Sequence, residues 1–316
     1  MKLSRLANLI GLVVAWLLIF GFFWWRLPAF GSLRNLELLA RQSTIVAMAA
    51  LGMTLVIVSG AIDLSVGSMV ALVTIVIAWF LREGHPAWVA LLAGLGAGAL
   101  CGLLNGTLIT KLKVGPFIVT LGSLLIFRGV AKWIGDEQKI DAPASWLPSL
   151  LSTLPDERRW MIVPPGVWLM VIFSILTAWL LTSTRFGRHV VAVGSNENAA
   201  RLCGVPVERV RLMVFVLMGF FAGLAGLMQF ARLTVGDPTV AVGLELDVIA
   251  AVVIGGASLA GGQGSILGSL IGAFIMATIR AGSSQMGLAN YVQEIVTGVI
   301  IVLAVTIDRV RVGRKG

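Results

Sequence analysis

Charged residues are scarce in this chain. Of its 316 residues, 12% are charged and 58% are hydrophobic, and the mean hydropathy is +0.97. Soluble domains carry about 25% charged residues, so a water-soluble fold of this size would have too few charges to cover its surface. The composition excludes a soluble protein and predicts one that resides in the lipid bilayer.

Cysteine and histidine are also rare. Cys101 lies in an apolar run and Cys203 in a basic loop, so we expect no disulfide between them. The two histidines, His85 and His189, are too few and too far apart in sequence for a histidine-built metal site. With a single tyrosine, Tyr291, the chain offers no nucleophile–base pair for a membrane-embedded enzyme. We therefore expect neither catalysis nor a cofactor in this chain.

Long apolar runs dominate what is present. A helix needs about 20 apolar residues to cross the roughly 30 Å of hydrocarbon in a bilayer. On this rule we predict an all-α, polytopic helix bundle, a single domain over residues 1–316 with about ten membrane segments, some of them broken or short. The predicted segments are 8–25, 43–59, 66–81, 88–110, 116–135, 164–182, 212–231, 246–259 (too short to cross comfortably), 265–283 and 290–307.

Basic residues are concentrated on one side of these segments. Membrane proteins keep an excess of lysine and arginine on the cytoplasmic side, and placing both termini there gives thirteen basic residues inside against nine outside. This predicts a cytoplasmic loop at 183–211 and a periplasmic loop at 136–163, and it explains the pI near 10.5 without nucleic-acid binding. The thirteen are Lys2, Arg5, Lys111, Lys113, Arg185, Arg188, Arg201, Arg209, Arg211, Arg309, Arg311, Arg314 and Lys315.

The first apolar run has one feature of a signal peptide, because it follows two basic residues. However, it contains bulky tryptophans and ends without a small-residue cleavage site. We expect it to be a retained membrane span.

Glycine is abundant, at 37 of 316 residues, and in three predicted spans it recurs at every fourth position. Residues four apart share one helix face, so a stripe of glycines lets a neighbouring backbone approach closely. We assign these stripes to helix packing rather than to substrate contact. They are Gly94, Gly98, Gly102 and Gly106; Gly219 and Gly223; and Gly264, Gly268 and Gly272.

Two Gly/Ser-rich breaks occur at corresponding places in the two halves of the chain. The first, 58–68, joins the second and third spans, and the second, 254–265, joins the eighth and ninth. Irregular backbone is tolerated inside a membrane only where protein or a cavity surrounds it, so such breaks often mark a transport path. Our candidates for a path or gate are Gly60, Asp63, Ser65, Gly255 and Gly256 from the breaks, and Arg128, the deepest charge in a span.

The charged candidates also have structural interpretations. Asp63 or Ser65 can cap the third span by accepting hydrogen bonds from the free amides at its start, and we favour this interpretation, although a capped break can also move. Arg128 can instead satisfy carbonyls or an acid on a neighbouring helix. Asp247, Arg280 and Glu294 lie near span ends, where we expect interfacial contacts or an ion pair.

The basic loop at 183–211 contains the signals for a short capped helix. A helix of this kind is either a rigid projection suited to docking on a soluble partner or a simple connector. Its sequence signals do not distinguish between these two roles. The signals are Asn196 as N-cap, Glu197 in the first turn, Ala199 and Ala200 as helix formers, and Gly204 at the left-handed position after the helix.

Four ordered blocks of the sequence span residues 50 to 264. They are 50–68; Asn105-Gly106 with 116–122 and Arg128-Gly129; Gly194-x-Asn196-x-x-Ala199-Ala200-x-x-x-Gly204-Val205; and 245–264. In order and spacing these blocks resemble the ribose/xylose/galactose-type ABC permease family, and the length of the chain suits that family. Ala61 and Ala257 depart from the residues usual in the family, but both are small, so packing is kept while substrate preference is left open.

The resemblance implies the membrane subunit of a type II-like importer in the bacterial inner membrane. Such a subunit pairs with a second permease copy, identical or different, and works with a cytoplasmic ABC ATPase and a periplasmic sugar-binding protein to import a monosaccharide. ATP would be bound by the ATPase, because this chain has no Gly-x-x-x-x-Gly-Lys-Ser/Thr phosphate loop. The residues that the resemblance assigns to ATPase coupling are Gly194, Asn196, Glu197, Ala199, Ala200 and Gly204.

The alternative is an ion-coupled secondary transporter of small solutes. Such carriers usually contain ionisable relays near the centre of the bilayer. The acidic residues here cluster at predicted span ends, which disfavours this alternative without excluding it.

Overall fold

The computed structural model of the chain describes residues 2–313, without the side chains of residues 2–8, 156, 158, 159, 304 and 307–313. Within this range the chain forms twelve α-helices, three short 3-10 helices and two short strands. The predicted inner charges at Lys2, Arg5, Arg309, Arg311, Arg314 and Lys315 lie outside what is described. The elements are α1 (Lys2–Arg26), η1 (Pro28–Gly31), α2 (Leu33–Val58), α3 (Val66–Arg82), α4 (Ala87–Lys111), α5 (Pro116–Ile134), β1 (Ile140–Asp141), η2 (Leu147–Leu150), η3 (Asp156–Met161), α6 (Pro165–Ser183), α7 (Arg185–Ser195), α8 (Glu197–Leu202), α9 (Val207–Leu233), β2 (Val235–Gly236), α10 (Leu244–Ile254), α11 (Ile266–Gln285) and α12 (Asn290–Gly313).

Each of the ten predicted membrane segments coincides with a helix, so the all-α polytopic prediction is confirmed. Seven described helices are long and apolar enough to cross a membrane, while Val66–Arg82 and Asn290–Leu303 are shorter apolar stretches. The eighth segment is α10, which has only 11 residues, as its short apolar run predicted.

Two helices differ most from the prediction. Helix α2 begins at Leu33 rather than at 43, with the Ser32 side chain accepting a hydrogen bond from the Asn35 amide. The apolar-run rule missed this first part because it contains charged residues. Helix α7 was expected only as loop; its strongly amphipathic pattern, with Val190 and Val193 buried, explains why an apolar-run search does not detect it.

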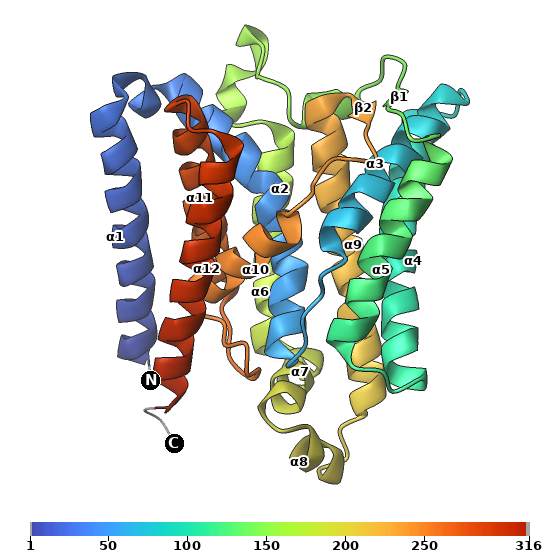
Figure 1. The fold of residues 1–316 in the computed structure, drawn as a ribbon, viewed down its shortest axis with the longest axis vertical. Helices are drawn as coiled ribbons and strands as arrows, with labels where there is room; N and C mark the ends of the chain where they lie inside the picture. The colour runs from blue at the N-terminus through green and yellow to red at the C-terminus, as the bar shows by residue number, and fades with distance from the viewer. Residues whose placement is uncertain (1, 314–316) are drawn as a thin grey trace.

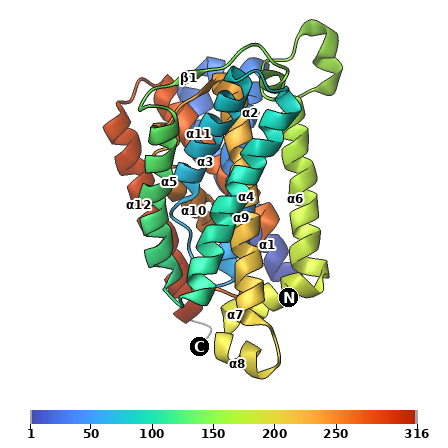
Figure 2. The same cartoon turned by 90° about the vertical axis from the view of Figure 1, so that its right-hand side faces the viewer.

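The long helices run side by side along the long axis of the molecule (Figure 1). Helix α1 begins and α12 ends at the same end as α7 and α8, and the antiparallel pair β1–β2 lies at the other end with segment 136–163. We call these the α8 end and the β end. The side view shows the same arrangement, with α8 projecting beyond the other helices (Figure 2).

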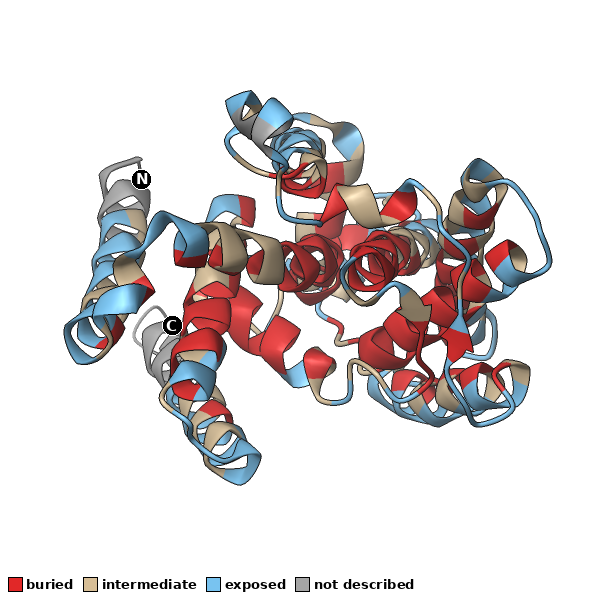
Figure 3. Cartoon of the chain, turned by 90° about the horizontal axis from the view of Figure 1, so that it is seen from above, coloured by how far each residue is buried: buried red, intermediate tan, exposed pale blue. Residues whose placement is uncertain are grey.

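Buried residues are concentrated in the middle of the bundle, and α1 and α12 lie at its edge (Figure 3). Every residue of α2 from Ser43 to Val58 is buried, as expected for a helix that is apolar all round. Around it pack α6, α9, α10 and α11.

The glycine stripes act in packing, as predicted. A Cβ added to Gly98 would lie 2.8 Å from the Gly223 Cα, and one added to Gly102 would lie 3.0 Å from the Gly219 Cα, so α4 and α9 touch backbone to backbone. In the same way, α10 and α11 meet where Gly268 and Gly272 face the end of α10.

Candidate functional site

The first break lies between the end of α2 at Val58 and the start of α3 at Val66. Gly60 has a φ of +79°, a left-handed conformation that glycine adopts without strain, and it reverses the chain after α2. The Ala61 amide donates to the Val56 carbonyl at 3.1 Å, which satisfies one of the free carbonyls at the helix end. The segment then runs back from the α8 end to the start of α3, part-way along the bundle (Figure 1).

A chain of buried polar side chains holds this break against two neighbouring helices. The Oδ1 atom of Asp63 accepts hydrogen bonds from the backbone amide and the hydroxyl of Ser65, at 2.8 and 2.6 Å. Asn105 of α4 donates from Nδ2 to Ser65 Oγ at 3.0 Å, and Ser123 of α5 donates to Asn105 Oδ1 at 2.6 Å. The break is thereby fixed to α4 and α5 through four side chains that are almost completely buried.

Of the two caps predicted for α3, Asp63 is confirmed, because it accepts from the amide of the N-cap residue Ser65, whereas the prediction for Ser65 is wrong. Ser65 occupies the N-cap position, but it has helical backbone angles and its side chain accepts no hydrogen bond from the first amides of the helix. Its hydroxyl is already bonded to Asp63 and Asn105. The other carboxylate oxygen, Asp63 Oδ2, is buried and has no hydrogen-bond partner among the described residues.

Asn105 and Ser123 are not among the site residues predicted from the sequence. Asn105 appeared only as part of a family-like block, and Ser123 did not appear at all. A polar amide in the middle of the glycine stripe of span four was the available signal, because a buried Asn in a membrane helix requires hydrogen-bond partners.

The second break follows the C-terminus of α10. Gly255 packs so closely against Gly268 of α11 that a Cβ would lie 2.5 Å from the Ser269 amide nitrogen, whereas Gly256 is exposed with a φ of +91°. The loop is closed by a hydrogen bond from the Ser258 amide to the Gln263 carbonyl at 3.0 Å. Here the contacts described are made mainly by the backbone.

The predicted short helix of the basic loop is present as α8. The Asn196 side chain accepts from the Ala199 amide at 2.9 Å, and Gly204 has a φ of +80°, so both predicted end signals are confirmed. Ala200 is the buried residue of this helix, and Leu202 at its end is 90% exposed. Gly194 does not lie in α8; it is the next-to-last residue of α7.

Ion pairs tie α8 to the start of α9. Glu197 binds Arg211 at 2.7 Å and Arg201 at 3.2 Å, and Arg201 also binds Glu208 at 2.6 Å. The hydrogen bond from Arg211, together with the nearby positive charges of Arg211 and Arg201, holds the pKa of Glu197 below its ordinary value. These side chains line a hollow of 330 Å³ between α8 and the α4–α5 connection.

Arg128 lies apart from both glycine breaks. Its guanidinium donates from Nη1 to the carbonyls of Pro238 and Val240, at 2.9 and 2.6 Å, in the segment that leads into α10. This is the carbonyl interaction that the structural interpretation predicted. Of the interfacial contacts or ion pair expected for Asp247, Arg280 and Glu294, the structure shows an ion pair between Asp247 and Arg280 at 2.6 Å.

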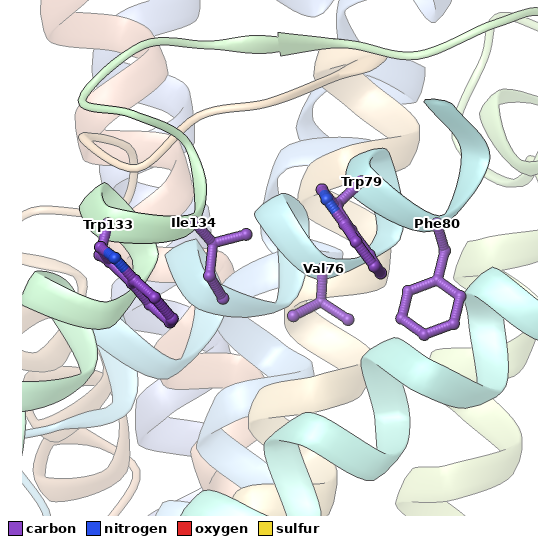
Figure 4. Close-up of a pocket in the computed structure, with 5 residues that line it drawn as sticks. All are labelled: Val76, Trp79, Phe80, Trp133 and Ile134. Atoms are coloured by element: carbon purple, nitrogen blue, oxygen red, sulfur yellow. The ribbon is translucent and has the colours of Figure 1, made fainter. Parts of the chain in front are cut away.

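A second hollow of 530 Å³ lies between α3 and α5 (Figure 4). Its lining is apolar, and Trp79 and Trp133 flank Val76 and Ile134 in the close-up. The candidate path residues do not line this hollow. The structure therefore gives no link between the candidate path residues and the hollow between α3 and α5.

Comparison with known proteins assigns the chain to a family. A family model described as "Branched-chain amino acid transport system / permease component" matches residues 35–305, a stretch that includes both breaks, α8 and the glycine stripes. The chain belongs to this permease family. Together with the sugar-permease relatives described next, this match confirms the permease family predicted from the sequence.

Several curated relatives are similar to the permease over most of its length. The ribose import permease protein RbsC of Escherichia coli K12 is 40% identical over 281 residues, 89% of this chain and 87% of that protein. RbsC of Bacillus subtilis 168 is 38% identical over 283 residues, 89% and 87% of the two chains. The L-arabinose ABC transporter permease protein AraH of Azospirillum brasilense is 33% identical over 315 residues, 97% and 89%. No solved structure matches the chain.

Three of the four family-like blocks of the permease include irregular elements, while the block of 105–106, 116–122 and 128–129 lies within α4 and α5. Block 50–68 contains the end of α2 and the first break, 194–205 contains the end of α7 and all of α8, and 245–264 contains α10 and the second break. The permease is a multi-pass membrane protein of a transport system.

Proposed function

We propose that the permease is the membrane subunit of an ABC importer that moves a monosaccharide of the ribose or arabinose kind into the bacterial cytoplasm. The observation that carries this proposal is its 33–40% identity, over 89–97% of its length, to permeases named for ribose and L-arabinose. The proposal names a class of sugar and not one sugar, because in the proposed system a separate binding protein selects the substrate.

The proposed orientation puts the α8 end in the cytoplasm of the inner membrane. Basic residues at helix ends there, among them Lys111, Lys113, Arg185 and Arg188, support it through the positive-inside rule. Segment 136–163 at the β end would then face the periplasm and the sugar-binding protein.

The proposed docking point for the ATPase is α8. This helix projects from the bundle, is capped at both ends and is held by ion pairs, so it can move as a rigid unit. Leu202 presents an exposed apolar side chain at its end, which suits an apolar pocket on a protein partner. The ATPase would hold the ATP, and a second permease copy would complete the transmembrane unit.

The proposed path or gate consists of the two breaks. Packed helices switch between discrete arrangements, and helix ends are where such movements are absorbed. Gly60, Asp63 and Ser65 at one break, and Gly255 and Gly256 at the other, are the candidates at helix ends; Arg128 holds the segment that enters α10.

The test is uptake by proteoliposomes that contain the permease with its ATPase and sugar-binding protein. With an ionophore collapsing the proton gradient, we expect labelled ribose or arabinose to accumulate only when ATP and the binding protein are present. Uptake that follows an imposed proton gradient and ignores ATP would support a secondary transporter instead.

A further inference from the structure

Three segments that are far apart in sequence meet backbone to backbone at the α8 end. They are the end of α2 at Val58, the end of α7 at Gly194 and the second break at Gly262. The Gly262 amide donates a hydrogen bond to the Val58 carbonyl at 2.9 Å. A Cβ added to Gly194 would overlap that same carbonyl and would lie 2.7 Å from the Gly262 nitrogen. We call this contact the glycine junction.

The two breaks also touch each other within the glycine junction. A Cβ added to Gly261 would lie 3.0 Å from the Gly60 Cα and 2.5 Å from the Gly194 carbonyl oxygen. Gly60, Gly261 and Gly262 all have φ between +74° and +88°, so their backbone conformations favour glycine as well. At these glycines the three backbones touch directly, which leaves little soft material to absorb a displacement, although the Ser195 side chain also lies against Gly262.

The junction lies immediately next to the proposed ATPase-docking helix. Gly194 is the next-to-last residue of α7, and only Asn196 separates α7 from α8. At its other end, α8 is linked to α9 by the short connection 203–206 and by its ion pairs with Glu208 and Arg211 at the start of α9. Those pairs join long, partly exposed side chains, which hold a position less firmly than packed backbone.

We infer that the glycine junction transmits movement of α8 to both breaks at once, with Gly194, Gly261 and Gly262 as positioning residues. This inference rests on the proposed function, in which the ATPase moves α8. It adds to that proposal the route by which the movement of α8 reaches the breaks. Because the glycine junction contacts both breaks, the two halves of the permease would respond together. Neither Gly261 nor Gly262 was among the residues predicted for the path or for ATPase coupling.

The first test is Gly194→Ala in the complete complex, with Gly96→Ala as control. Gly96 lies on α4 with no atom within 4 Å of an added Cβ, so its variant should behave as wild type. For Gly194→Ala we expect ATPase binding and hydrolysis to persist while sugar transported per ATP falls by about tenfold. An unchanged ratio of sugar to ATP would overturn the inference.

The second test leaves the junction packing untouched. Inserting two glycine residues between Ser195 and Asn196 adds slack between α8 and the junction without placing a side chain in it, so folding should be kept even if Gly194→Ala misfolds. We expect the insertion to lower sugar transported per ATP about as much as Gly194→Ala does. We expect Arg211→Gln, which weakens the α9 link, to have a smaller effect. The reverse order would place transmission in α9 and overturn the inference.

The outcomes separate the two proposals. If the wild-type complex shows no ATP-driven uptake, the proposed function fails before the junction is tested. If the wild type transports and both junction variants keep its ratio of sugar to ATP, only the junction inference fails.

Discussion

The two breaks occupy corresponding places in the chain but are held in different ways. The first is fixed by side chains, from Asp63 through Ser65 and Asn105 to Ser123. The second is fixed mainly by close backbone contacts, above all between Gly255 and Gly268. A hydrogen-bonded break tolerates changes that keep its donors and acceptors, whereas a glycine-packed break tolerates almost no added volume.

The largest effect is expected from Gly268→Ala at the second break. The new Cβ would overlap the Gly255 carbonyl oxygen, a backbone atom that cannot move without shifting α10. We expect a loss of about 1–3 kcal/mol of stability, measured as unfolding in detergent, as for other overpacked cores. Gly298→Ala on α12, where an added Cβ meets nothing within 4 Å, is the matched control and should change little.

Asn105→Leu should have the next largest effect, at the first break. It removes the middle of the polar chain, leaving Ser65 Oγ without its Asn105 donor and the Ser123 hydroxyl without its acceptor. Leaving buried polar groups unpaired costs about 1–3 kcal/mol. Ser123→Ala removes only the last donor and should cost less; equal costs would show that the chain does not act as a unit.

Asp63→Asn should have a smaller effect at the same break. The amide keeps an oxygen where Oδ1 accepts from the Ser65 amide and hydroxyl, so we expect a change in stability of less than about 1 kcal/mol. Asp63→Leu, which removes the acceptor, should be clearly worse. A large loss in the Asn variant would mean that the charge of Asp63, rather than its acceptor geometry, holds the break.

The smallest effect is expected at α8, where the links are partly exposed ion pairs. The folded-state pKa of Glu197 is lowered by its hydrogen bond from Arg211, so its contribution to stability is complete above the unfolded pKa of about 4.3 and is lost as the pH falls through the lower folded value. Hydrogen exchange of the α8 amides should accelerate at acid pH in the wild type. In Arg211→Gln the acceleration should be smaller, because the folded and unfolded pKa values of Glu197 then differ less.

The sequence predicted which faces of the helices pack together and where some helices end, but it did not predict contacts between segments far apart in the chain. Glycine spacing correctly indicated the α4–α9 contact, and Asn196 with Gly204 correctly indicated both ends of α8. Asp63 was predicted as a candidate site residue, but the rest of its hydrogen-bonded chain could not be predicted. Asn105 and Ser123 lie 42 and 60 residues further along the sequence, and only the fold brings them close to Asp63.

The glycine junction shows the same limit. The breaks were noticed as a weak internal repeat, yet nothing local in the sequence indicates that Gly194 lies between Val58 and Gly262. Helix α7 was missed for a different reason, since its apolar residues form one stripe and not a continuous run.

The most direct test of this account is whether α8 and the breaks move as one body. Spin labels can be placed at three exposed positions, Asn198 on α8, Gln263 in the second break and Glu137 at the β end, in the complex with and without ATP bound. We predict that the distance between Asn198 and Gln263 stays constant while the distance from Gln263 to Glu137 changes. A changing distance between Asn198 and Gln263, with Gln263 fixed relative to Glu137, would contradict the account.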